Sequence, residues 1–78
     1  MPENVSISIE LEETATGVDA TGWFELSGKT YRANAHAPEN HRDHRLAHNL
    51  AMARVIRGLE LELMEWIHEH IDRCIMDE

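Results

Sequence analysis

The amino-acid sequence predicts an α+β fold in which a three-stranded antiparallel meander is followed by one long C-terminal helix. Three observations lead to this prediction. Apolar and polar residues alternate in three segments before Pro38, glycine-containing turns separate these segments, and apolar residues after Pro38 recur at helical spacing. A chain of 78 residues has room for a single small domain, which we expect to span 1–78.

The three strands are predicted from their two-residue period. In VSISIELE (5–12), valine, isoleucine and leucine occupy every second position. The turn-rich stretch TATGVDATG then leads to a second strand that ends at Leu26. SGK (27–29) predicts a short hairpin connection, and TYRANAHA (30–37) predicts a third strand that Pro38 ends. Such a meander has one apolar face, across which the helix is expected to lie.

The helix is predicted from about residue 41 to about residue 75. Asn40 is the candidate cap, with Asp43 three residues later in an arrangement like a capping box. From Leu46, apolar residues recur at positions 50, 53, 56, 59, 63, 67, 71 and 74. Gly58 interrupts this pattern and leaves two alternatives. It is either a tolerated glycine in a continuous helix or the site of a bend or a close crossing.

Cysteine content and hydropathy indicate the compartment. Cys74 is the only cysteine, so no disulfide can form within the chain, and a lone thiol fits a reducing environment. No apolar run is long enough to span a membrane, and the N-terminal residues do not form a signal peptide. We therefore expect a cytoplasmic protein without a membrane partner.

The net charge of −8 disfavours nucleic acid as a partner, because an acidic protein repels phosphate at long range. The charge is unevenly distributed, however. Residues 29–57 contain six bases and two acids, a net charge of +4, whereas the segments on either side are acidic. The basic middle segment leaves a local nucleic-acid contact open.

The segment YRANAHAPENHRDHRLAHNLAMARVIRGLELEL (31–63) resembles a family of small actinobacterial proteins of unknown function. The matching elements are RAN at 32–34, PE at 38–39, LAxAR at 50–54 and Leu59, within a region of resemblance from 18 to 64. The resemblance implies a β-β-β-α fold similar to that of double-stranded-RNA-binding domains, and it implies no activity. The sequence departs from the family in its histidine-rich stretch and in a longer helix. A small phage accessory protein would also fit this size.

The stretch HAPENHRDHRLAH (36–48) raises the question of a metal site. If the helix begins near His41, then His41, His44 and His48 fall within about 60° of one another. Two histidines four residues apart can share a metal ion, and Glu39 or Asp43 could add an oxygen ligand.

Two other interpretations of the histidines remain open. Arg42 and Arg45 lie among them and would repel a cation. The histidine stripe also lies roughly opposite Leu46 and Leu50, so it is expected to face solvent. The stretch is then either a solvated helix start or a pH-responsive surface.

The helix suggests self-association, because its expected length of roughly 50 Å is about twice the length of the strands. Its apolar residues continue beyond the sheet, and uncovered apolar surface of this size is typical of an interface. The expected homodimer interface consists of Leu59, Leu63, Met64, Trp66, Ile67 and Ile71. An antiparallel second copy would place Glu62, Glu65 and Glu69 near the partner's Arg45, Arg54 and Arg57.

The sequence therefore predicts a non-enzymatic, homodimeric regulatory module that binds another protein. It shows no catalytic set and requires no cofactor. The first alternative is a nucleic-acid-binding module, in which Trp23 and Tyr31 would stack on bases. Its cationic residues would be Arg32, Arg42, Arg45, Arg54 and Arg57. The second alternative is a metal-binding protein that uses the histidine stripe.

Overall fold

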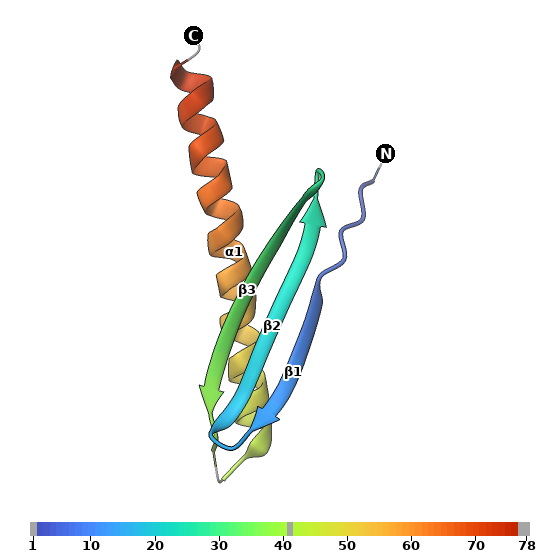
Figure 1. Cartoon of the computed structure of the whole chain (residues 1–78), viewed down its shortest axis with the longest axis vertical. Coiled ribbons are helices and arrows are strands. Elements are labelled where there is room, and N and C mark those ends of the chain that lie inside the picture. Colours follow the sequence, from blue (N-terminus) through green and yellow to red (C-terminus); the bar gives the residue numbers. More distant parts are fainter. Residues whose placement is uncertain (1, 41, 77–78) are drawn as a thin grey trace.

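The computed structural model describes residues 2–40 and 42–76, and it describes residues 72–76 by their backbone alone. The chain forms β1 (Ser8–Thr14), β2 (Gly17–Leu26), β3 (Lys29–Pro38) and α1 (His44–Met76) in that order (Figure 1). The strands make one antiparallel sheet in the order β1-β2-β3. The predicted α+β fold, a meander followed by one long helix, is confirmed.

The two faces of the sheet differ in composition. Ile9 pairs with Gly22, and Gly22 pairs with Ala33, so that these three residues lie in a row on the face toward α1. Trp23 and Arg32 pair on the opposite side, which we call the open face. The predicted alternation of buried and exposed residues is confirmed in β2 and β3. In the first strand, pairing begins only at Ser8, and Ile9 is half-buried whereas Leu11 is exposed.

The β2–β3 hairpin turns over two residues with positive φ, Ser27 at 54° and Gly28 at 80°. A two-residue connection with both φ angles positive matches the right-handed twist of the strands that it joins. The hairpin therefore forms where the sequence predicts it. Serine in this left-handed conformation is less favourable than asparagine or glycine.

The helix packs on the sheet through small residues. Every fourth residue is buried in the row Ala47, Ala51, Val55 and Leu59. Because these side chains are short, the helix backbone approaches the sheet closely. At Gly58, an added Cβ would lie 2.9 Å from the Cβ of Ala33. The helix is continuous through Gly58, which permits a close approach to β3.

The predicted direction of the apolar helix face is wrong for its first half. The helical spacing of apolar residues predicts that Leu46, Leu50 and Ile56 lie on the face toward the sheet, but all three are exposed. The sheet instead contacts the alanine-rich row one position along. Alanine is only weakly hydrophobic, so it contributes little to a hydropathy pattern. Both the helix and the sheet contribute alanines to their contact.

The helix also begins later than predicted, at His44. The Asp43 carboxylate accepts a hydrogen bond from the backbone N–H of Arg45 at 2.9 Å, which caps the first turn. The side-chain oxygen of Asn40 accepts hydrogen bonds from the backbone N–H groups of Arg42 and Asp43 at 2.9 and 3.2 Å. Asn40 therefore shapes the turn before the helix, and Asp43 is the cap.

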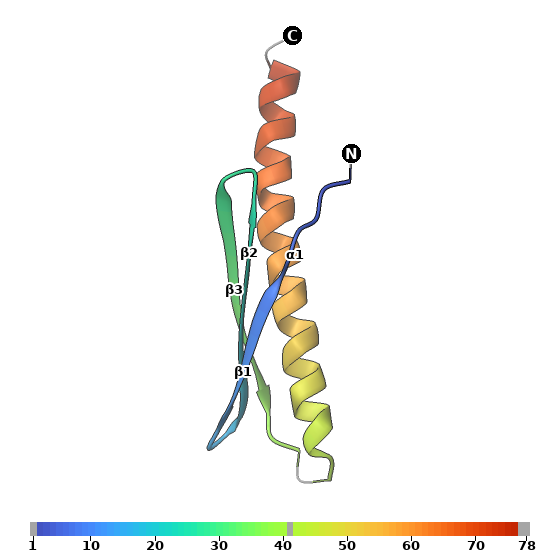
Figure 2. The same cartoon turned by 90° about the vertical axis from the view of Figure 1, so that its right-hand side faces the viewer.

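The helix lies over β3 and β2 and makes few contacts with β1. Its C-terminal turns continue past the β2–β3 hairpin, and no other described element covers its side away from the sheet (Figures 1 and 2). No helix within the described residues combines the length and the hydrophobicity that crossing a membrane requires.

Candidate functional site

The face of α1 that points away from the sheet carries a row of residues that we call the outer stripe. Its members are Leu46, Leu50, Ala53, Arg57, Glu60, Met64, Ile67 and Ile71. Four of its apolar side chains are exposed to fractions of 50% at Leu46, 36% at Leu50, 39% at Met64 and 48% at Ile71. Large apolar side chains gathered in this way are typical of a surface that another chain covers.

An apolar groove adjoins the outer stripe on the side of β1, with a volume of about 370 Å³. The groove exists because α1 leaves the β1 side of the sheet uncovered, where Ile7 and Val5 remain exposed. Ile56 and Glu60 lie at its helix rim, so the groove and the outer stripe form a continuous surface. The full lining is Val5, Ile7, Phe24, Leu26, Ile56, Leu59, Glu60 and Leu63.

The residues predicted for the dimer interface fall on two faces of the helix. Leu59 is only 3% exposed and belongs to the core, which leaves it almost no surface for a partner. Leu63 and Trp66 are half-buried and pack against the cluster around Phe24. The other three predicted residues, Met64, Ile67 and Ile71, belong to the outer stripe.

The remaining members of the outer stripe were missed from the sequence. The sequence pattern groups Leu46, Leu50 and Ala53 with the apolar residues of the helix in general, and it does not indicate that Arg57 and Glu60 lie at the centre of an apolar row. The signal that identifies all of them is the alternation of four-residue and three-residue steps along the outer stripe.

The arginines predicted for a nucleic-acid surface lie on several surfaces. Arg32 lies on the open face of the sheet, and Arg57 lies on the outer stripe. Arg42 precedes α1, and the Nε atom of Arg45 lies 3.4 Å from the Asp43 carboxylate. The described positions do not combine these cations into one patch.

Arg54 has a structural role at the free edge of β3. Its Nη1 atom donates a hydrogen bond to the backbone carbonyl oxygen of His36 at 2.7 Å. An unpaired carbonyl at a sheet edge is a site where another strand can add. Arg54 therefore covers part of this edge from the helix.

The two aromatic residues predicted to stack on bases lie on opposite faces of the sheet. Trp23 is half-buried on the open face, whereas Tyr31 is buried beneath α1 and stacks on Phe24 with ring centroids 4.9 Å apart. They cannot form a shared stacking platform. The open face also carries four acids, at Glu10, Glu12, Asp19 and Glu25.

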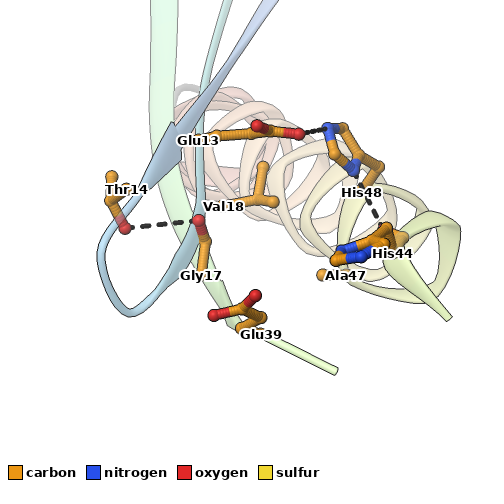
Figure 3. Close-up of a pocket in the computed structure, with 8 residues that line it drawn as sticks. All are labelled: Glu13, Thr14, Gly17, Val18, Glu39, His44, Ala47 and His48. Atoms are coloured by element: carbon orange, nitrogen blue, oxygen red, sulfur yellow. Dashed lines mark hydrogen bonds and ion pairs between the residues drawn. The ribbon is translucent and has the colours of Figure 1, made fainter. Parts of the chain in front are cut away.

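The histidine stretch borders a small pocket of about 110 Å³ between β1 and the start of α1 (Figure 3). His44 and His48 line it from the helix, Glu13 lines it from β1, and Glu39 lies at its opposite end. His44 is exposed, as expected for a solvent-facing stripe, whereas the side chain of His48 is 34% exposed and contacts Glu13 of β1. Leu46 and Leu50, expected on the side opposite the histidines, are exposed as well.

Both ring nitrogens of His48 face oxygen acceptors. Nδ1 lies 3.0 Å from the carbonyl oxygen of His44, and Nε2 lies 3.3 Å from the Glu13 carboxylate. These two contacts place the His48 ring between α1 and β1.

Only part of the predicted metal site lies within the described residues. His41 lies outside the described residues. Among the residues that are described, no group of three or more histidine, cysteine, aspartate or glutamate side chains is arranged to hold a metal ion. A metal site that includes His41 stays a prediction.

Comparisons of the chain with protein-family models, with curated proteins and with solved structures found no match. The β-β-β-α order that the sequence resemblance implies is present. The likeness to actinobacterial proteins and to double-stranded-RNA-binding domains has no support from these comparisons.

Proposed function

We propose that this protein is a non-enzymatic, cytoplasmic protein-interaction module, and that two copies associate through the outer stripe of α1. The observation that carries this proposal is the line of exposed leucine, methionine and isoleucine side chains along a helix of 33 residues. Removing apolar surface from water stabilises a complex by about 25 cal/mol per Å². A second copy of the same stripe supplies a matching apolar surface.

The small core of the single chain supports this proposal. Among the residues whose side chains the structure describes, four of the nine buried hydrophobic ones are alanines, and the largest fully buried side chain is that of Val55. A domain of this length buries too little apolar surface for high stability, and oligomerisation is a common remedy. The outer stripe offers the additional apolar surface that the core lacks.

The edges of the sheet are less suitable for self-association. Pairing of two β1 edges would bring the acidic Glu10 and Glu12 of both copies together, and like charges across strands are destabilising. At the other edge, Arg54 already donates a hydrogen bond to the backbone carbonyl oxygen of His36. These features favour the helix as the contact surface.

The nucleic-acid alternative has less support. The resemblance to a double-stranded-RNA-binding-domain-like family suggests it, but the arginines are dispersed and the open face of the sheet is acidic. A surface that neutralises phosphates needs its cations gathered together.

The proposal is tested by sedimentation equilibrium over a concentration series, with two matched variants. Met64 and Met52 are both in α1 and have similar exposures of 39% and 36%, but only Met64 belongs to the outer stripe. Because an aspartate in the stripe would be desolvated in the dimer, Met64→Asp should give a monomer. Met52→Asp should retain the dimer.

A wild-type protein that stays monomeric at high concentration would refute the proposal. A dimer that Met64→Asp leaves intact would retain self-association and reject the outer stripe as its site. Circular dichroism of both variants checks that the helix and the sheet are still formed.

A further inference from the structure

We propose that the two helices pair antiparallel in one register, with Arg57 of each copy facing the partner's Glu60 across the two-fold axis. This inference rests on the proposed self-association and assigns its geometry. The two residues lie at the middle of the outer stripe and are both exposed. Four charges therefore meet at the centre of an otherwise apolar contact.

The spacing of the outer stripe is that of a coiled-coil seam. From Leu46 to Ile71 its positions are separated by alternating steps of four and three residues, which gives a seven-residue repeat. A repeat of this kind keeps the same side chains against a partner helix over several turns. Its apolar members on either side of the centre can pack as layers.

The central charges distinguish the two possible orientations. In a parallel, in-register pair, Arg57 would face the partner's Arg57, and Glu60 would face the partner's Glu60. Both contacts would be repulsive in a desolvated seam. In an antiparallel pair, each arginine faces a glutamate, and the two-fold axis produces this attractive contact twice.

The same antiparallel register matches the apolar layers by size. Leu50 faces the partner's Ile67, and Leu46 faces the partner's Ile71. The small Ala53 faces the long side chain of the partner's Met64, so that the layer can fill without a clash. In each of these pairs, as in the central one, the two residue numbers add to 117.

A shift by one repeat would bury charge against apolar groups. In one direction, Arg57 would face the partner's Ala53, and in the other direction, it would face the partner's Ile67. Either shift leaves a glutamate and an arginine desolvated without an opposite charge. The central pair therefore acts as a register lock, as single polar residues do in coiled coils.

The fold leaves room for this arrangement. The sheet packs on the face of α1 that carries Ala51 and Val55, opposite the outer stripe, so each sheet lies on the outside of the pair (Figure 2). Beside the seam, Ile56 comes opposite the partner's Leu63. Both residues line the apolar groove, which the contact would extend or close.

Charge reversal provides the first test, with the dimer dissociation constant from sedimentation equilibrium as the readout. Arg57→Glu and Glu60→Arg should each weaken the dimer by roughly tenfold or more, because each places two like-charged pairs at the axis. The double variant Arg57→Glu, Glu60→Arg swaps the charges and should recover most of the affinity. Recovery is the result that a merely structural role would not produce.

Cysteine cross-linking provides the second test, in a Cys74→Ser background. Ala53→Cys combined with Met64→Cys should form a covalent dimer on oxidation, since these positions face each other. Leu46→Cys with Met64→Cys, which corresponds to a register shifted by one repeat, should remain largely uncross-linked. Ala53→Cys alone should also stay monomeric in a denaturing gel.

The outcomes separate the two proposals. A wild-type dimer whose affinity does not respond to the charge reversals, or one that cross-links through Ala53→Cys alone, would overturn the antiparallel register and leave self-association intact. Equal cross-linking of the shifted pair would also overturn the register. A monomeric wild type would overturn both proposals.

Discussion

At Gly58, the missing side chain sets the distance between the helix and β3. A glycine-to-alanine change inside an exposed helix normally stabilises a protein by about 1 kcal/mol, because alanine has the higher helix propensity. Here the new Cβ would lie 2.9 Å from the Cβ of Ala33. The strand that carries Ala33 is held by β2, and α1 is held by its buried row on the sheet, so neither can withdraw freely.

We therefore expect Gly58→Ala to lower the free energy of unfolding by about 1 kcal/mol or more, the usual effect of overpacking. Adding Ala33→Gly removes the opposing methyl group and should recover most of the loss. Urea denaturation at one fixed protein concentration measures both effects. A Gly58→Ala variant that is more stable than the wild type would contradict the close approach.

At the scale of elements, the strands could be predicted because each has one face of apolar residues and one face of polar residues. The helix could be predicted in length but not in orientation. It has apolar side chains on two sides, and the side toward the sheet carries Ala47 and Ala51, whereas the larger Leu46 and Leu50 face solvent. Hydropathy periodicity selects the side with larger residues, and only the tertiary contact shows which side the sheet covers.

The β2–β3 hairpin provides a prediction at this scale. Ser27 has a φ of 54°, a conformation that asparagine adopts more readily than serine. We expect Ser27→Asn to raise the free energy of unfolding by about 0.5 kcal/mol, and Ser27→Val to lower it by about 1 kcal/mol because of its β-branched side chain. Thermal denaturation followed by circular dichroism measures both changes. A Ser27→Val variant that is as stable as Ser27→Asn would contradict the turn geometry.

At the scale of the whole molecule, the candidate site could be predicted only in part. Met64, Ile67 and Ile71 follow from the excess length of the helix. The other half of the surface depends on knowing that the sheet covers the opposite face, which a single sequence does not specify. The charge pairing expected of Glu62, Glu65 and Glu69 stays a prediction. These residues lie off the outer stripe, whose charged members are Arg57 and Glu60.

Self-association should make stability depend on protein concentration. A dimer that unfolds to two separate chains is stabilised by mass action, so the Tm of the wild type should rise as its concentration increases. The Tm of Met64→Asp should be lower and independent of concentration, because this variant is expected to be monomeric. Differential scanning calorimetry over a hundredfold range of concentration measures this difference. A wild-type Tm that does not change with concentration would argue against a coupled dimer.

The two short connections of the sheet also have a kinetic consequence. Only residues 15–16 join β1 to β2, and only residues 27–28 join β2 to β3. Each strand therefore finds its neighbour after closing a very small loop, and little chain entropy is lost before pairing begins. The pairing of neighbouring strands is therefore local in sequence. Folding of the single chain should accordingly be fast, on the order of milliseconds or less, and docking of a second chain would be the slower, concentration-dependent step.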